Sequence, residues 1–177
     1  MNNIHIISQI INGLGVLINM IGINIKTKSR TLLFFIIGNT CGAIALGLLN
    51  ATAGMLVQII FVLETIINFF LEKKNLKFPK WLVLPYIFIP CCVLTITFSS
   101  YWDFLPILAG ILFPLAIISK NFVLRLLNLI AVMSWIPYCL HFGQYVGAIG
   151  SSILSIMNIV SIIRFDVLKK KLDFHNQ

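Results

Sequence analysis

The chain begins with two long apolar runs that a short basic segment separates: HIISQIINGLGVLINMIGINI (residues 5–25), KTKSR (26–30) and TLLFFIIGNTCGAIALGLL (31–49). Each run has about 20 residues, the length that an α-helix needs to cross a hydrocarbon layer of about 30 Å. The basic segment follows the first run, whereas a secretory signal peptide carries its basic residues before its apolar stretch. We therefore expect both runs to remain in the protein as membrane-spanning helices.

The same pattern continues through the 177 residues of the sequence. Hydrophobic residues make up 59% and charged residues 10%, with a mean hydropathy of +1.01, whereas soluble domains have about 25% charged residues. The sequence predicts an all-α integral membrane protein whose single transmembrane domain covers residues 1–177. The seven predicted helices cover residues 5–25, 31–49, 55–71, 81–99, 104–119, 124–142 and 145–163.

The charges of the connections alternate along the chain. The basic connections are residues 26–30, 72–80, 120–125 and the tail 164–177. The uncharged or acidic ones are residues 50–54, 100–103 and 143–144. With seven spans, all 13 Lys and Arg residues fall on one side, which the positive-inside rule assigns to the cytoplasm. We expect the N-terminus outside and the tail in the cytoplasm, as a short solvated stop rather than an amphipathic helix on the inner leaflet. This topology also explains the net charge of +8 better than nucleic-acid binding does.

The first three and the last three predicted spans resemble each other at an offset of about 95 positions. GVL at residues 15–17 corresponds to GIL at 110–112, and Arg30 corresponds to Arg125. Three spans, one linking span and three spans would form a 3+1+3 arrangement of parallel repeats, related by an axis along the membrane normal. The predicted parts are a first triple-helix bundle at 5–71, a linking helix at 81–99, a second bundle at 104–163 and the tail at 164–177.

Glu64 is an ionisable residue within the third predicted span, and Asn68 lies one turn further on the same helix face. Ionisable groups inside a membrane are costly and usually face a cavity or a partner. One interpretation is that Glu64 lines a solute path or carries a coupled proton. The other is that it is a hydrogen-bonded structural group that joins helices. The sequence leaves both interpretations open.

The sixth and seventh spans add aromatic and amide groups. Trp135 and Tyr138 contribute to a face that mixes aromatic surface with hydrogen-bonding groups, which suits a ring-shaped or polyhydroxylated solute. Asn158 falls opposite Glu64 in the repeat alignment. Small and amide residues in the first, second and seventh spans predict close helix packing instead. These packing residues are Asn12, Gly15, Asn19 and Gly22, Gly38 and Gly42, and Gly147, Ser151 and Ser155.

Three segments are similar to those of a known family: FLPILAGIL at 104–112, SWIPY at 134–138 and NIVSIIRFD at 158–166. Together with the glycine-bearing first helix and its Lys/Arg cluster, they make the chain resemble the YgjV family of bacterial inner-membrane proteins over nearly its whole length. The match departs at HFGQY, residues 141–145, where a glycine-serine turn is more usual. The resemblance implies a place in the inner membrane more than an activity.

The predicted 3+1+3 layout is in turn similar to that of the SWEET sugar carriers and the PnuC vitamin carriers. Those carriers use an Asn on the third helix of each bundle and aromatic groups on the second. The similarity implies that Asn158 and Trp135 play these parts in the second bundle, and that Glu64 replaces the Asn in the first. This is an analogy of fold and carries no proof of function.

The prediction from sequence is a carrier or facilitator of a small polar solute, with its site between the bundles near the bilayer midplane. The predicted site residues are Glu64, Asn68, Trp135, Tyr138 and Asn158. The alternative is a non-transporting membrane adaptor or scaffold protein that recruits a partner. A polar cavity at Glu64 would favour the carrier, and a packed centre the adaptor. Catalytic and metal-binding motifs are missing from the sequence, so we expect the protein to have no enzymatic activity, cofactor or metal. The expected partners are the lipid bilayer and a small solute, not nucleic acid.

Overall fold

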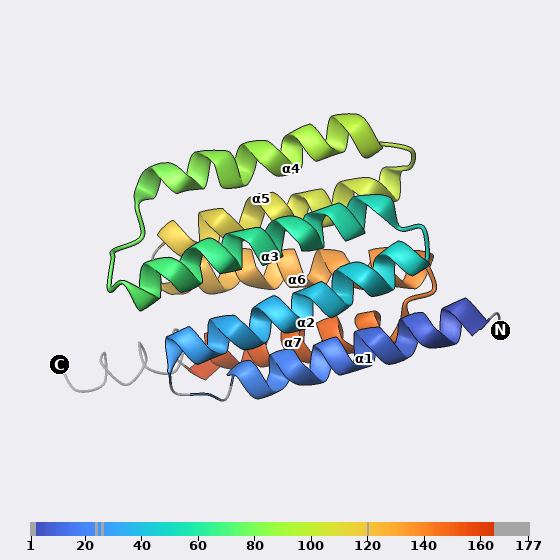
Figure 1. Ribbon diagram of the computed structural model, residues 1–177, viewed down its shortest axis with the longest axis horizontal. Helices are drawn as coiled ribbons and strands as arrows, with labels where there is room; N and C mark the ends of the chain where they lie inside the picture. Colours follow the sequence, from blue (N-terminus) through green and yellow to red (C-terminus); the bar gives the residue numbers. More distant parts are fainter. Residues whose placement is uncertain (1–2, 24, 26, 120, 165–177) are drawn as a thin grey trace.

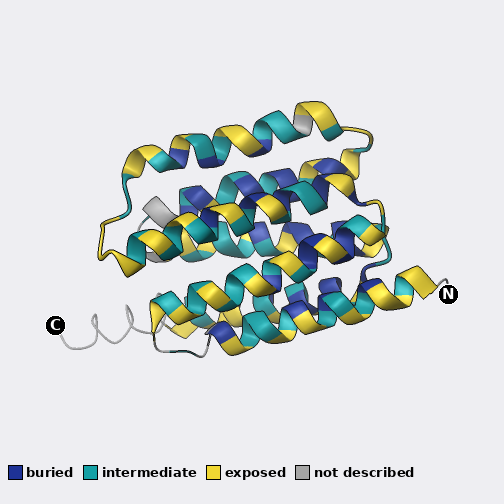
Figure 2. Ribbon diagram, in the orientation of Figure 1, coloured by how far each residue is buried: buried dark blue, intermediate teal, exposed yellow. Residues whose placement is uncertain are grey.

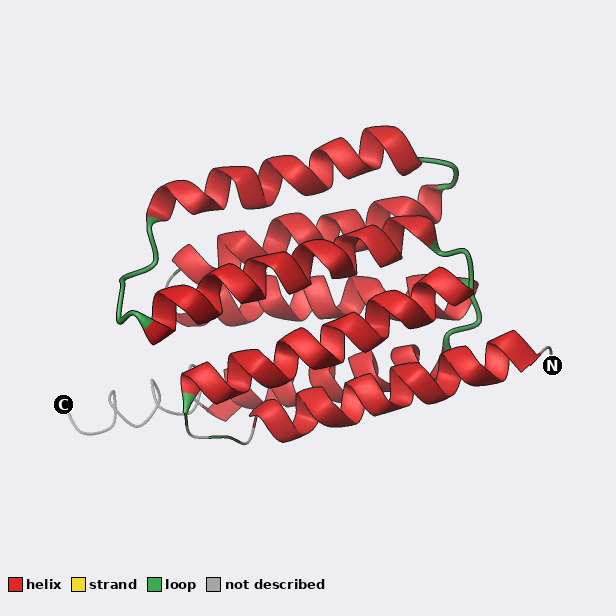
Figure 3. Ribbon diagram, in the orientation of Figure 1, coloured by secondary structure: helices red, strands yellow, loops and turns green. Residues whose placement is uncertain are grey.

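The computed structural model describes residues 3–23, 25, 27–119 and 121–164, and this part of the chain contains seven α-helices and no strand (Figures 1 and 3). The prediction of an all-α fold is confirmed. Figure 1 shows the helices lying side by side along the long axis of the molecule. The helices are α1 (Asn3–Ile23), α2 (Lys28–Leu48), α3 (Thr52–Lys73), α4 (Val83–Thr97), α5 (Phe104–Ile118), α6 (Asn121–His141) and α7 (Tyr145–Ile162), and the short 3-10 turns η1 (Lys80–Leu82) and η2 (Tyr101–Asp103) precede α4 and α5.

Six of these helices are long and apolar enough to cross a membrane, which makes them candidate spans by length and composition. They are α1, α2, α3, α4 with the η1 turn, α6 and α7. The remaining helix, α5, has 15 residues and is apolar throughout. At 1.5 Å per residue it is about 22 Å long, so it is shorter than a typical hydrocarbon core.

The outer surface of the bundle is more apolar than parts of its interior. In α1 the side chains of Leu14, Leu17 and Ile21 are exposed, whereas Ser8 and Asn12 are buried. Figure 2 shows exposed and buried residues alternating along the helices nearest the viewer. In a soluble amphipathic helix the exposed residues are polar and the buried residues apolar, which is the reverse of the pattern in α1. The surface is therefore suited to hydrocarbon, in which backbone polar groups must be satisfied within the helices.

Successive helices make the most extensive contacts, with α2 packed between α1 and α3, and α6 packed between α5 and α7. Two further contacts, α3 with α5 and α1 with α7, join these two groups of three. Helix α4 lies to one side and packs against α5 and, to a smaller extent, against α3 (Figure 1). The main cluster of buried hydrophobic side chains lies among α2, α3, α5, α6 and α7, and Val93 of α4 packs against it.

Glycines allow α1 and α2 to approach closely. A Cβ atom on Gly15 would lie 2.7 Å from the backbone oxygen of Gly38, and one on Gly22 would lie 2.8 Å from Cβ of Phe34. Both glycines are buried, as is Asn12 on the same face of α1. The predicted packing face of the first span is therefore confirmed, because larger side chains at these positions would separate the two helices.

The basic residues of the described chain lie at one end of the bundle, where α2, α4 and α6 begin and α3 and α7 end. We call it the basic end. Lys28 at the start of α2 forms a salt bridge of 2.8 Å with Glu72 at the end of α3. The basic residues at this end are Lys28, Arg30, Lys73, Lys74, Lys77, Lys80, Arg125 and Arg164. Lys26, Lys120 and the predicted tail from residue 165 onward lie outside the described residues.

The opposite end is held by hydrogen bonds between α1 and the connection from α6 to α7. The Gln9 side chain donates to the backbone oxygen of Gly143 at 2.6 Å and accepts from the backbone N–H of Val146 at 2.9 Å. Gln144 donates to the hydroxyl of Ser8, which itself donates to the Ala45 carbonyl in α2. The first helix is thereby fixed to the last two.

Candidate functional site

Glu64 lies on the one stripe of α3 that is buried against other helices. Gly54, Val57, Ile60 and Glu64 follow one another at intervals of three or four residues, so they share a face, and all four are buried. Glu64 is only 6% exposed, and nine residues, about 13 Å of helix, separate it from Lys73 at the basic end. Its Oε1 atom is buried and has no hydrogen-bond partner. The carboxyl group therefore lies inside a candidate span with part of its bonding capacity unused.

Tyr86 in α4 is a second buried polar group of the candidate site. It is 3% exposed, its hydroxyl oxygen is buried without a hydrogen-bond partner, and its helix packs against α3. The ring of Phe78, in the connection before α4, contacts the Tyr86 ring with a centroid separation of 6.1 Å. Two buried oxygens, one on α3 and one on α4, thus have free hydrogen-bonding capacity in the same region. Tyr86 is absent from the site predicted from sequence.

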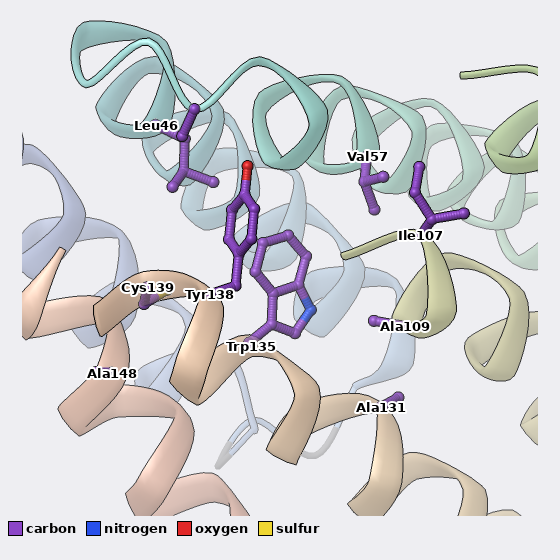
Figure 4. Close-up of a cluster of buried hydrophobic side chains, with 10 residues drawn as sticks. Leu46, Val57, Ile107, Ala109, Ala131, Trp135, Tyr138, Cys139 and Ala148 are labelled. Carbon is purple, nitrogen blue, oxygen red and sulfur yellow. The ribbon is translucent and has the colours of Figure 1, made fainter. Parts of the chain in front are cut away.

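Trp135 and Tyr138 lie in the main cluster of buried hydrophobic side chains, between α6 and the helices that it faces (Figure 4). Their rings meet edge to face with centroids 5.9 Å apart. The backbone N–H of Gly54 donates a hydrogen bond of 2.8 Å to the Tyr138 hydroxyl. Figure 4 shows the Tyr138 ring extending from α6 toward α3, with Trp135 beside it. Both aromatic side chains therefore fill space between the first three and the last three helices.

These two rings belong to a longer series of aromatic contacts, which we call the aromatic column. It begins at the end of the bundle opposite the basic end, where Trp102 stacks on His141 with centroids 4.7 Å apart, and it reaches Phe61 in α3, 6.4 Å from Trp135. The Phe61 ring also contacts that of Phe113 in α5, at 5.4 Å. Phe61 precedes Glu64 by three residues, on the same side of α3. The members of the aromatic column are Trp102, His141, Phe142, Tyr138, Trp135 and Phe61.

The other two predicted site residues lie elsewhere or are less enclosed. Asn158 in α7 accepts a hydrogen bond of 3.0 Å from the Asn128 side chain in α6 and donates one to the Leu154 carbonyl. Its amide thus joins α6 to α7. Asn68 is half-buried one turn beyond Glu64. The structure brings Trp135 and Tyr138 together, and Phe61, one turn before Glu64 in α3, contacts the Trp135 ring. Asn158 instead has a polar partner, Asn128.

This arrangement of apolar helices can be compared with known proteins. The model of the Imp-YgjV family, described as bacterial inner membrane protein, matches residues 6–169. The chain belongs to this family. Comparison with curated proteins and with solved structures gave no match. Membership of the Imp-YgjV family and the six long apolar helices make the chain a multi-pass protein of the bacterial inner membrane.

The Imp-YgjV match includes every candidate residue described above, from Glu64 and Tyr86 to Asn158. Sequence reasoning missed Tyr86, Asn128 and the glutamines at residues 9 and 144. One signal was available for all four, because each is a hydrogen-bonding side chain within or next to an apolar run, where such groups need partners. The sequence does not indicate which partners these side chains have, because hydropathy does not show which helix faces lie opposite each other.

Proposed function

We propose that this member of the Imp-YgjV family is a carrier or facilitator that moves a small polar solute across the inner membrane, with Glu64 as its central binding group. The observation that supports this proposal is the buried Oε1 atom of Glu64, which has no hydrogen-bond partner inside a candidate span. Buried polar groups are nearly always satisfied, and an exception calls for a ligand, water or ion that would complete its bonding. The hydroxyl of Tyr86 would offer a second contact, as donor or acceptor.

The proposed architecture is the 3+1+3 arrangement, with α4 as the linking helix. If α1, α2 and α3 correspond to α5, α6 and α7, the contact of α1 with α7 corresponds to the contact of α5 with α3. Both contacts occur, as a two-fold axis along the membrane normal would require. Glu64 and Asn158 then occupy corresponding places in α3 and α7. In this arrangement the site lies at the boundary between the two repeats.

The proposed topology has seven crossings, with the basic end in the cytoplasm. Helix α5 would be the seventh span, since it connects η2 at the opposite end to α6, which begins at the basic end. Its shortness would be accommodated by local thinning of the bilayer. The aromatic column then lies between Glu64 and the periplasmic surface, so in the proposed carrier it would form the periplasmic barrier.

Uptake into proteoliposomes tests the proposal. The full chain is reconstituted, a uniformly ¹³C-labelled bacterial metabolite extract serves as the probe, and labelled compounds retained in the vesicles are identified by mass spectrometry. We expect at least one polar compound to enter faster than in protein-free vesicles, and Glu64→Gln to reduce that rate at least tenfold, as loss of a buried charged contact of about 1.5–3 kcal/mol implies. Glu72→Gln is the matched control, because it changes the same group at the end of α3 and should retain uptake.

The packed centre gives specific support to a second function, that of a non-transporting adaptor or scaffold. The aromatic column and the cluster around Val57 and Ile107 occupy the region between the two groups of helices (Figure 4). An adaptor needs no path through this region. If wild-type vesicles retain no labelled compound above the protein-free level, the adaptor becomes the better proposal. Neither proposal includes catalysis.

A further inference from the structure

Residues 73–81, KKNLKFPKW, connect α3 to α4 and carry four lysines and no acidic residue. We call this segment the basic loop. All four lysines are exposed. Glu72, the acidic residue next to the loop, is already paired with Lys28 of α2. Within the described part of the chain, no ion pair involves a lysine of the basic loop, so its positive charge is available to an external partner.

The basic loop has a defined shape where it leaves α3. Asn75 adopts a left-handed conformation with φ of 53°, and the N–H of Leu76 bonds to the Leu71 carbonyl at 2.9 Å. This is the geometry of a Schellman cap, which satisfies the last carbonyls of a helix and reverses the chain. Further along, Phe78 packs on Tyr86 and fixes the loop to α4. The lysines are therefore presented from a structured turn, which lowers the entropy that binding would cost.

Two apolar side chains accompany the lysines. Leu76 is 55% exposed and Trp81 is 66% exposed. Trp81 lies in η1, directly before α4, at the end of a candidate span. Tryptophan at such a position lies at the level of the lipid headgroups, with its ring partly among the acyl chains. The loop thus combines ammonium groups with apolar side chains at the depth where phosphate groups and acyl chains meet.

We propose that the basic loop is a docking surface for the headgroup of an anionic phospholipid. Charge complementarity selects the phosphate, because no carboxylate in the described part of the chain pairs with these four ammonium groups. Exposed Leu76 and Trp81 select a lipid over a free phosphate ion, because only a lipid provides apolar surface next to the phosphate. This inference concerns a lipid partner and does not depend on whether the protein transports a solute.

Native mass spectrometry of the full-length protein in detergent tests the proposal. The protein is titrated with dioleoylphosphatidylglycerol or with dioleoylphosphatidylcholine, which has the same acyl chains and no net charge, and bound lipids are counted. We expect the anionic lipid to bind at least tenfold more tightly. Lys77→Gln combined with Lys80→Gln should weaken its binding at least tenfold, because each lysine near an anionic surface contributes about a fivefold factor. Circular dichroism verifies that the variant is folded.

Two control variants separate the basic loop from general attraction. Arg30→Gln removes a positive charge from the same end of the bundle, keeps the Lys28–Glu72 salt bridge and should retain binding within about twofold, since binding by the loop needs no contact with α2. Lys77→Arg with Lys80→Arg keeps the charge and should retain binding. Equal affinity for both lipids, or an equal loss in the α2 variant, would overturn the proposal. Displacement of the lipid by an excess of glycerol 3-phosphate would also overturn it, because the apolar contact would then have no role.

Discussion

The backbone N–H of Gly54 in α3 donates a hydrogen bond of 2.8 Å to the hydroxyl of Tyr138 in α6, across 84 residues of sequence. Gly54 is in the first turn of α3, where backbone N–H groups have no acceptor within the helix. Tyr138 supplies one. A Cβ atom on Gly54 would overlap the Tyr138 ring, so the absence of a side chain is what allows the two groups to meet.

Gly54→Ala should lower the free energy of unfolding by about 1–3 kcal/mol, the usual effect of inserting a methyl group into packed surroundings. Denaturation by sodium dodecyl sulfate in mixed micelles measures the change. Gly13→Ala is the matched control, because its Cβ atom would lie 3.5 Å from Val146 Cγ1, an ordinary contact. Similar losses in both variants would show that the Tyr138 contact is not what restricts residue 54.

Tyr138→Phe keeps the ring and removes the hydroxyl, which leaves the buried Gly54 N–H without its acceptor. We expect a loss of about 1–3 kcal/mol in the free energy of unfolding, the cost of a buried donor without a partner. Tyr101→Phe serves as the control, since Tyr101 is 89% exposed and its hydroxyl is accessible to solvent. A loss no larger than that of the control would mean that the hydrogen bond adds nothing to stability.

Glu64→Met should make the protein more stable and abolish solute uptake. The substitution replaces a buried carboxyl group that lacks a full set of partners with an apolar side chain of similar length, which removes a desolvation cost. Functional groups often carry such a cost in stability. Thermal unfolding in detergent and uptake into proteoliposomes are measured together. A clear decrease in melting temperature would instead identify Glu64 as a structural group that joins helices.

The Asn128–Asn158 pair should behave as a coupled unit. A double-mutant cycle with Asn128→Ala and Asn158→Ala should give a coupling energy of about 0.6 kcal/mol, and at most about 1.7 kcal/mol, as for other hydrogen bonds between membrane helices. The measurement is again denaturation in mixed micelles. Strictly additive losses would mean that the 3.0 Å contact between the two side chains does not stabilise the fold.

Cysteine labelling should show the basic end in the cytoplasm. In a variant without the four native cysteines, a membrane-impermeant maleimide should label Tyr101→Cys in spheroplasts, and should label Lys77→Cys only after permeabilisation. Phe122→Cys, at the start of α6, tests whether α5 crosses the membrane. It should behave like Lys77→Cys. If it is labelled together with Tyr101→Cys, α5 does not cross and the chain has six spans.

The helices could be predicted from sequence because the signals for a membrane helix are local. Length, hydropathy and short polar connections set each boundary, and the predicted segments agree with α1 to α7 to within a few residues. The predicted packing face of α1 was also a local pattern, since Asn12, Gly15 and Gly22 recur at helical spacing.

The contacts of the candidate site were less predictable. Gly54 and Tyr138 could each be identified as unusual, but their hydrogen bond depends on how α3 faces α6, and helices that are apolar on all sides carry little information about rotation. The same holds for Tyr86. Its burial follows from the position of α4 beside α3 and α5, which no periodic pattern in the sequence specifies. Asn158 was matched to Glu64 by alignment, yet the two have different neighbours because Asn128 is available only to Asn158.

The hydrogen bonds of Gln9 have a consequence for biogenesis. Its two partners, Gly143 and Val146, follow it by 134 and 137 residues, so ribosomes must synthesise the chain as far as α7 before both bonds can form. Until then Gln9 would be a polar group on a newly inserted helix that has only lipid or the insertion machinery on that side, whereas Ser8 can already donate to Ala45 once α2 is in place. Assembly of this bundle therefore depends on the synthesis of α7, and a chain that stops before α7 would expose to cellular quality control the polar groups of α1 that the folded bundle buries.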